Sequence, residues 1–511
     1  MHLVLISTSG NQSYIFASNR LREAVGASYL VARSTTAWVA SAAALAGGTV
    51  LQASSGSTLV TVPDEDAARA LAHEVTLTAL RNAPGLAVRA ASIAIACDAP
   101  TGDEVRAAFS EHRSFSARCP SIATRHQRLP MVAACDSTDG PAQSWHADTL
   151  RGVDGLEPEE PRLLSAEVIA KRAARPAAAQ KLADLLAGDQ RLTSRRLVKI
   201  DKFFDQVEWV GVVHADGNQL GAFFREAADV LGGRMVEDRS VLGMLSEQVQ
   251  AVADAAFLDA TAALASRVRA GRLPLVPLII GGDDLTALVD GRHVLAFVRE
   301  YLVAFARHSV LPEHGLIAEV MKEVGQQQLT ASTGVAIVKP HFPFSVAYRL
   351  ADELCSNAKG LLHRHPGHHG IDVHVLIDST VTDLRAIRSR YEEGTTAVLT
   401  ERPFLIGAGS ASLPPERDWD VLLERLEQIA DTPSGGDGVL VTRTQLHALR
   451  DELRRDPGRA RRRLKDLGDR VPTTGADRDR LNALRSGGDG LARGLLDLLE
   501  LAPFVRAEET L

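Results

Sequence analysis

The residues best suited to chemistry are the adjacent carboxylates of Asp283 and Asp284, which end the sequence Gly-Gly-Asp-Asp at 281–284. Apolar runs at 273–280 and 285–289 flank this sequence and predict a β-hairpin whose tight turn uses the glycines. Neighbouring like charges repel each other, and a bound cation such as Mg²⁺, which prefers oxygen ligands, relieves that repulsion. Because Gly and Asp are also ordinary turn residues, the motif alone leaves a solvated turn equally open.

We predict that the elements around this hairpin form a βααββαβ unit that the chain contains twice, at residues 1–118 (the first copy) and 206–385 (the second copy). Chance similarity between short strings is the alternative. In the first copy we predict strand 3–8, helical residues 14–30, strands 49–53 and 58–62, a helix from about 64 to 81, and strand 88–95. In the second copy we predict strand 210–215, a helix from about 220, the hairpin, a helix at 293–308 and strand 330–337.

The two copies share short motifs but differ in their acids. Residues 10–12 of the first copy match 217–219 of the second, and both read Gly-Asn-Gln. In the same way, 54–57 match 281–284, and 91–95 match 331–337. Asp216 of the second copy corresponds to Ser9, and the Gly-Gly-Asp-Asp turn corresponds to Ser-Ser-Gly-Ser in the first copy. Since the first copy forms these turns without carboxylates, the acids of the second copy favour chemistry over structure.

Asp216 ends a strand that we expect to lie beside the hairpin in an antiparallel sheet, close to Asp283 and Asp284. Such a cluster suits the two-metal arrangement for in-line attack on phosphate. We therefore predict Asp216, Asp283 and Asp284 as catalytic residues and metal ligands, with Mg²⁺ or Mn²⁺ as the ion. Backbone N–H groups between Gly217 and Gly221 begin a predicted helix and can bind phosphate.

The predicted nucleotide-binding residues are Gly217, Asn218, Gly221, Gly281, Gly282 and Lys359. Asn218 offers a neutral oxygen ligand or a hydrogen bond, although an ordinary turn residue is an equal alternative. Lys359 lies in the helical pattern 347–362 and can reach a triphosphate as a point charge, whereas many lone helical lysines are simply solvated.

Three further groups carry weaker signals. Their members are Cys119, His126, Cys135 and His146; then His363, His365, His368 and His369; and a basic tract of Arg454, Arg455, Arg459, Arg461, Arg462, Arg463 and Lys465. The first group has irregular spacing for a metal site, and we favour a plain connecting module at 119–205. Pro366 and Gly367 interrupt the histidines, which favours a loop. The basic tract suits RNA or DNA phosphates, but a solvated helix face is the default.

Length and composition limit the number of domains and the classes of protein to which this chain can belong. A chain of 511 residues predicts about three or four domains, and 45% hydrophobic residues with a net charge of −7 give no general reason for nucleic-acid or membrane binding. The four cysteines contain no Cys-x-x-Cys pair, which indicates reduced thiols.

The N-terminal segment lacks the basic n-region of a signal peptide, and no stretch has 18 uninterrupted strongly apolar residues. We therefore expect a cytoplasmic protein without a membrane span. Residues 386–511 are mostly helical by periodicity and predict a separate C-terminal helical domain.

The ordered motifs resemble the second palm domain of the polymerase-like large subunit of type III CRISPR complexes. They are Asp216 to Gly221, Gly-Gly-Asp-Asp at 281–284, Ser332 to Ile337, Pro343, and Ala358 with Lys359. The first copy, in which residues 9–12 lead into Tyr14, Ile15 and Phe16, resembles that family's first palm. The resemblance covers about residues 1–380.

The resemblance implies an α/β (α+β) fold with two ferredoxin-like palm domains, antiparallel sheets and a helical last domain. It also implies that a ribose 3′-hydroxyl attacks ATP to make cyclic oligoadenylate messengers, with Asp216, Asp283 and Asp284 as metal ligands and Lys359 as a triphosphate contact. The chain departs from the family where a second Asp is often found, at Asn218, and it lacks the zinc-binding cysteine pairs. It begins at the first palm without a His-Asp nuclease domain, so DNA cleavage is not expected.

Two classes of function remain at this stage. The first is a nucleotidyltransferase that joins ATP into cyclic oligonucleotides, with a cyclic mononucleotide or dinucleotide cyclase as a close variant. The second is a non-catalytic nucleotide-binding scaffold of a ribonucleoprotein. The expected partners are nucleoside triphosphates, with guide or target RNA, other CRISPR-type subunits and a homo-oligomer left open.

Overall fold

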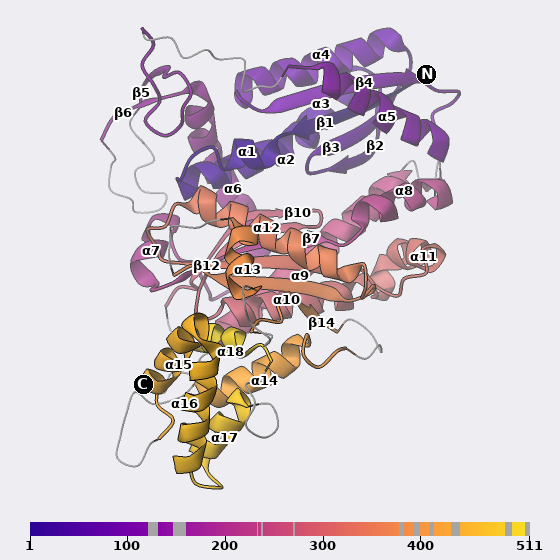
Figure 1. Ribbon diagram of the computed structural model, residues 1–511. Coiled ribbons are helices and arrows are strands. Elements are labelled where there is room, and N and C mark those ends of the chain that lie inside the picture. Colours follow the sequence, from indigo (N-terminus) through magenta and orange to yellow (C-terminus); the bar gives the residue numbers. More distant parts are fainter. Residues whose placement is uncertain are drawn as a thin grey trace.

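The computed structural model places two stacked α/β layers above a group of C-terminal helices (Figure 1). It describes residues 1–120, 131–146, 160–231, 234–236, 239–268, 271–377, 383–392, 399–407, 413–430, 440–485 and 493–505. The first copy forms the upper layer in this view, and the second copy lies beneath it. Within the described ranges, no helix is both long enough and apolar enough to cross a membrane.

The first copy contains a four-stranded sheet with the order β2-β3-β1-β4. Its elements are β1 (His2–Ser9), α1 (Asn11–Ile15), α2 (Leu21–Thr35), α3 (Ala37–Leu45), β2 (Thr49–Ser54), β3 (Ser57–Val62), α4 (Glu65–Asn82), β4 (Ala87–Ala94) and α5 (Gly102–Arg118). Side-chain caps fix where helices begin: Asp64 accepts from the N–H of Ala67 at α4, and Thr101 and Glu104 form a capping box at α5.

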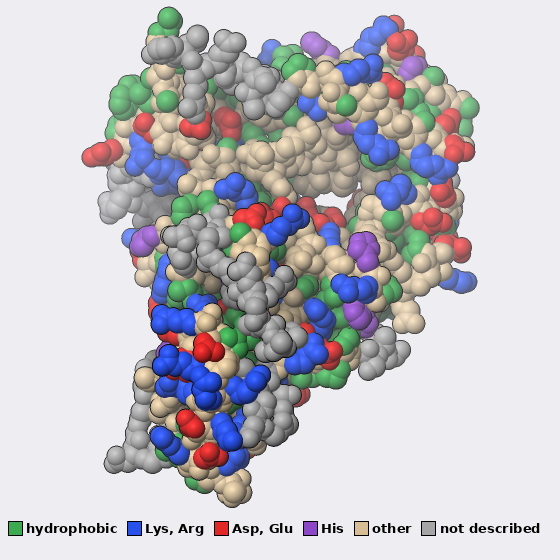
Figure 2. All heavy atoms as spheres, in the orientation of Figure 1, with side chains coloured by type: hydrophobic (Ala, Val, Ile, Leu, Met, Phe, Trp, Pro, Cys, Tyr) green, Lys and Arg blue, Asp and Glu red, His purple; other side chains and the backbone are tan. Residues whose placement is uncertain are grey.

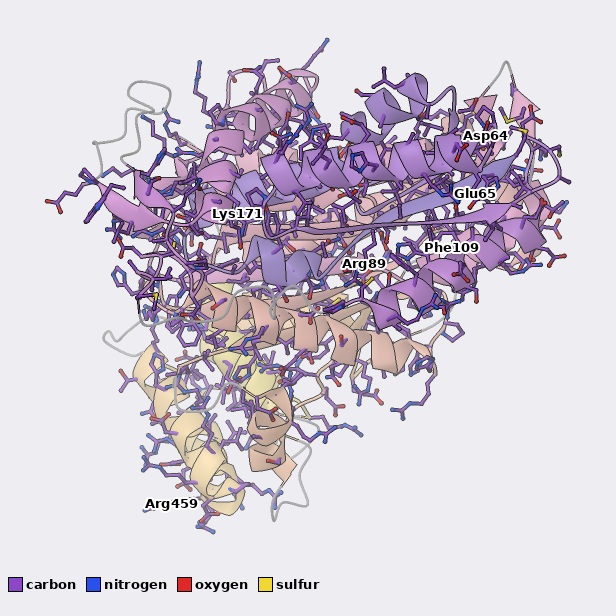
Figure 3. The ribbon with its side chains drawn as sticks, turned by 90° about the horizontal axis from the view of Figure 1, so that it is seen from above. Asp64, Glu65, Arg89, Phe109, Lys171 and Arg459 are labelled. Carbon is purple, nitrogen blue, oxygen red and sulfur yellow. The ribbon has the colours of Figure 1, made fainter. Side chains whose placement is uncertain are left out.

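A connecting module with β5 (Ser144–His146), β6 (Arg162–Leu164) and α6 (Ala166–Ala187) follows. Helix α6 packs closely on α2, because any side chain at Gly26 would collide with the carbonyl of Lys171. Lys171, labelled in Figure 3, is buried and pairs with Glu167 at 2.5 Å, and Arg172 pairs with the buried Glu23 at 2.8 Å. The module is therefore anchored on the first copy by charges that are neutralised inside the contact.

The second copy contains a six-stranded sheet with the order β10-β11-β7-β12-β13-β14. Its strands and helices, after η2 (Ile200–Lys202) and α7 (Phe203–Gln206), are β7 (Val210–Gly217), α8 (Leu220–Leu231), β8 (Met235–Val236), β9 (Arg239–Ser240), α9 (Val241–Arg267), β10 (Leu275–Gly281), β11 (Asp284–Asp290), α10 (Val294–Ser309), η3 (Pro312–His314), α11 (Gly315–Glu323), β12 (Ala331–Val338), α12 (Phe344–Leu362), β13 (His369–Val375), α13 (Leu384–Glu392) and β14 (Phe404–Ile406).

The predicted repeat is visible in the strand orders, because β10-β11-β7-β12 repeats β2-β3-β1-β4 element by element. Both sets are antiparallel, so the predicted α/β fold with two ferredoxin-like units and antiparallel sheets is confirmed. Two strands extend the second sheet beyond the repeat. Strand β13 is parallel to β12, as expected for strands joined by a helical crossover, and β14 pairs with β13.

Strand β14 lies inside the range 386–511, which we predicted to be a helical domain, yet it belongs to the sheet of the second copy. The predicted match of 91–95 with 331–337 is wrong in register. Asp216 pairs with Ser332, whereas Ser9, its counterpart, pairs with Ala87 and not with Ser92. The correct strands were matched, but a short shared string did not determine which residues lie side by side.

The remaining helices are α14 (Trp419–Ala430), α15 (Arg443–Arg455), α16 (Pro457–Arg470), α17 (Ala476–Leu484) and α18 (Leu495–Leu501), followed by η4 (Ala502–Phe504). Their buried apolar residues continue the core under one face of the second sheet, where α9 and α10 pack. The opposite face packs against α12 and against α1 and α2 of the first copy. Both copies therefore contribute to the hydrophobic cluster on this second face.

Candidate functional site

The fold brings the three predicted carboxylates together at one end of the second sheet. Asp216 is the penultimate residue of β7, Asp283 lies in the β10–β11 turn, and Asp284 begins β11. The pairing of Leu285 with Ala215 sets Asp284 beside Asp216. Carboxylate oxygens from the three residues lie within 4.8 Å of one another. Figure 2 shows acidic side chains gathered beside a hollow between the two copies.

The repulsion between the carboxylates of this cluster favours binding of a cation. Burial, followed by the nearby charge of Asp216, raises the pKa of the Asp283 carboxyl to about 7. Burial and the charge of Asp283 likewise raise the pKa of Asp284 well above its ordinary value. A divalent cation would relieve this repulsion, and a set made only of oxygen donors fits Mg²⁺ or Mn²⁺. Asp216, Asp283 and Asp284 would hold the ion.

Lys359 enters the same cluster from α12. Its Nζ forms an ion pair with Asp216 Oδ2 and donates to the carbonyl oxygen of Gly217 at 3.0 Å. About one third of each side chain of this pair is exposed, so the ammonium group can also meet a ligand that enters from solvent. The structure thus places the predicted lysine next to the predicted acids.

The glycines of the site have different tasks. A Cβ atom at Gly217 would lie 2.0 Å from Leu220 Cδ1 and 2.9 Å from the Cβ of Asp283, so glycine allows both residues to approach the backbone closely. Gly282 has φ +63°, the left-handed region that favours glycine, and it forms the turn. A Cβ at Gly281 would lie 3.3 Å from the Cβ of Ser55 in the first copy's matching turn. Gly221 has more space, since its nearest neighbour would be Arg225 Nη1 at 3.7 Å.

Asn218 holds the end of β7 to its neighbours. Its side-chain nitrogen donates to Thr330 Oγ1 at 2.9 Å and to the carbonyl of His368 at 3.4 Å. Its oxygen accepts from Ser332 Oγ at 2.8 Å. Both ends of the amide are therefore engaged with protein. The next residue, Gln219, has φ +57° and leads directly into α8, whose N-terminus follows the acidic cluster.

A layer of polar residues behind the cluster was not predicted from the sequence. His214, two positions before Asp216 on β7, contacts Thr286 Oγ1 through Nδ1 at 3.2 Å and Asp352 Oδ1 through Nε2 at 3.5 Å. Burial lowers the pKa of His214, which keeps the imidazole neutral at neutral pH. The signal was present in the sequence, since alternate strand residues share a face, and Asp352 and Lys359 are two helical turns apart on α12.

The other metal-type groups do not converge in the same way. In the parts of the chain that the structure describes, Asp216, Asp283 and Asp284 are the only group of three or more side chains placed to hold a metal ion together. His369 lies on β13, where its Nδ1 accepts from the N–H of Ala331 at 3.1 Å, and His363 is the C-cap residue that follows α12. His126 of the other predicted group lies outside the described residues, and Cys119 and Cys135 are free thiols.

Comparison with known proteins agrees with this geometry. Residues 209–365 match the family model described as Cas10/Cmr2, second palm domain. The whole chain is similar in fold to a Csm1–Csm4 cassette in complex with pppApA, with a TM-score of 0.51, 13% identity, and coverage of 99% of this chain and 69% of that chain. For a Csm1–Csm4 cassette in complex with AMPPNP, the TM-score is 0.50 and the identity is 13%, with coverage of 98% of this chain and 69% of that chain. No curated protein matches. The family match spans the strand of Asp216, the hairpin and the helix of Lys359.

Proposed function

We propose that this chain, whose residues 209–365 match the second palm domain of the Cas10/Cmr2 family, is a Mg²⁺-dependent nucleotidyltransferase that joins ATP into cyclic oligoadenylate. The observation that carries the proposal is the convergence of Asp216, Asp283 and Asp284 within 4.8 Å, beside Lys359. The two similar structures support ATP as the substrate class, because they hold an ATP analogue and a linear product of ATP joining.

In the proposed reaction, a ribose 3′-hydroxyl attacks the α-phosphorus of a second ATP. A new P–O bond forms, the bond to the β-phosphate oxygen breaks, and pyrophosphate leaves with the electron pair while the hydroxyl loses its proton to solvent. Divalent ions bound by Asp216, Asp283 and Asp284 would supply charge stabilisation for the attacking and leaving oxygens. Lys359 places a positive charge where the triphosphate enters, and the neutral His214 and Thr286 support the acidic residues from behind.

The proposal includes a place in a type III CRISPR complex, with a Csm4-like subunit as partner. A second candidate function is a non-catalytic nucleotide-binding scaffold of such a complex. Its support is the basic tract, because Figure 2 shows Lys and Arg side chains gathered over the C-terminal helices, and Arg459 projects from the end of α16 in Figure 3. Several of these arginines are already paired, including Arg454 with Glu500 and Arg463 with Glu452.

The test is to incubate the protein, alone and with its complex partners, with each labelled nucleoside triphosphate and Mg²⁺ or Mn²⁺. Mass spectrometry of the products separates cyclic oligonucleotides from a cyclic mononucleotide or dinucleotide. We expect an ATP-derived product that disappears in the Asp283→Ala, Asp284→Ala double variant. The matched control is Glu65→Ala, Asp66→Ala, which removes two adjacent acids from α4 of the first copy. No new phosphodiester under any condition would leave the scaffold as the better account.

A further inference from the structure

The turn that carries the acids is held from outside by a residue of α9. The N–H of Gly282 donates to Gln250 Oε1 at 2.6 Å. Gly282 is the residue with positive φ in this turn, and Asp283 and Asp284 follow it directly. A hydrogen bond at this point limits rotation of the peptide that leads into both carboxylates.

A second hydrogen bond determines which end of the Gln250 amide faces the turn. Its Nε2 donates to Asp254 Oδ1 at 2.9 Å, one helical turn further along α9. A backbone N–H can only donate, and an ionised carboxylate can only accept, so the two partners together fix the amide orientation. Asp254 also lines a cavity of about 120 Å³ between the copies, together with Lys181 of α6 and Ser55 of the first copy.

We infer that Gln250, oriented by Asp254, is a positioning residue that sets the Gly-Gly-Asp-Asp turn in the geometry required for metal binding. This inference rests on the proposed function. A Cβ at Gly281 would lie 3.3 Å from the Cβ of Ser55 and 4.0 Å from Gln250 Oε1, so the first copy and α9 both lie against the turn. The carboxylates of the turn lie within 4.8 Å of that of Asp216.

The same helix offers a matched control for a purely structural role. Gln248 also accepts backbone N–H groups through its Oε1, from Leu316 at 3.2 Å and Ile317 at 3.3 Å, at the start of α11. It thus supports a different element by the same type of contact. Loss of either glutamine should lower thermal stability, but only loss of Gln250 should affect the hairpin.

The experiment compares Gln250→Leu, Gln248→Leu, Asp254→Asn and Asp254→Leu in the full chain. Amide hydrogen exchange of the segment 279–285 and product formation from ATP are measured for each, with the melting temperature as a check on folding. In Gln250→Leu we expect about tenfold faster hairpin exchange and an about tenfold lower kcat, since one short hydrogen bond is lost. Gln248→Leu should match the wild type in both. Asp254→Asn keeps an acceptor and should also match it, whereas Asp254→Leu should resemble Gln250→Leu.

Equal hairpin exchange in Gln250→Leu and wild type would overturn the inference. Faster exchange with unchanged kcat would overturn it too, because the contact would then serve only the fold. A wild-type protein that forms no product refutes the proposed function instead. Mn²⁺ affinity measured by calorimetry then replaces kcat as the second readout, and an undiminished affinity in Gln250→Leu contradicts the positioning role.

Discussion

At the scale of single residues, the site depends on how closely backbone and carboxylates approach each other. Gly217 is the clearest example, because its missing Cβ leaves room for Asp283. Lys359 is the second, because its ammonium group already balances part of the charge on Asp216. Each residue has a counterpart elsewhere in the chain that lacks this relation to the acids, and each therefore gives a controlled prediction.

Replacing Gly217 with Ala should weaken Mn²⁺ binding about tenfold, because the added methyl group meets the side chain of Leu220 and the Cβ of Asp283. Overpacking of this kind costs about 1–3 kcal/mol. Isothermal titration calorimetry measures the affinity. Gly315→Ala, at the start of α11, is the control, since its Cβ would have no atom within 4 Å. Equal affinities in the two variants would show that the close approach at Gly217 has no role in the metal site.

Replacing Lys359 with Met keeps the length of the side chain but removes its charge. We expect the KM for ATP to rise about tenfold to a hundredfold, since a charged hydrogen bond contributes about 1.5–3 kcal/mol. Steady-state kinetics provide the measurement, and Lys322→Met, on the exposed side of α11, is the control. An unchanged KM would assign Lys359 to a solvated or purely structural role.

At the scale of elements, β13 extends the repeat and carries two buried histidines. Burial lowers the pKa of His369 to about 4, and burial followed by the charge of Arg402 lowers that of His374 to about 3. Both imidazoles are therefore neutral in the folded protein. Because their unfolded pKa is about 6.5, their contribution to stability is present above pH 6.5 and is lost as the pH falls below it.

The free energy of unfolding should consequently fall between pH 7.5 and pH 5, by about 2 kcal/mol for each of these histidines. Urea denaturation at both pH values measures it. The His374→Gln variant should lose about 2 kcal/mol less than the wild type over this interval. If both proteins lose the same stability, His374 does not stay neutral in the fold.

At the scale of the whole molecule, the first copy supports the second without supplying acids of its own. Phe16 of the first copy lies 3.9 Å, centroid to centroid, from Tyr348 of α12, and Tyr348 lies 5.4 Å from His214 in an edge-to-face contact. One chain of packed rings therefore leads from the first copy to the residues behind Asp216. Both copies also contribute to one continuous hydrophobic cluster.

Phe16→Ala should lower both the melting temperature and the rate of product formation, although Phe16 is far along the chain from the acids. Truncation of a buried Phe costs about 3–5 kcal/mol. Thermal melting and the ATP assay are measured on the same preparations. Phe109→Ala, on the exposed side of α5 and labelled in Figure 3, is the control for losing a phenylalanine from the first copy. Full activity in Phe16→Ala would show that packing of the first copy on α12 is not needed for product formation.

Much of this arrangement follows from the sequence because it depends on local patterns. The hairpin, the repeat and the meeting of Asp216 with Asp283 and Asp284 follow from strand order and turn residues. Strand β14 was missed because three residues are too few to show a period. Gln250 was missed because its partner, Gly282, is brought to it only by the packing of α9 on the hairpin.

The most direct measurement is a crystal structure of the protein with an ATP analogue and Mn²⁺, with anomalous scattering used to locate the metal. We expect a manganese peak about 2.1 Å from oxygens of Asp216, Asp283 and Asp284, with the triphosphate beside Lys359. Bound nucleotide without manganese at these carboxylates, or with its triphosphate away from them, would contradict this expectation.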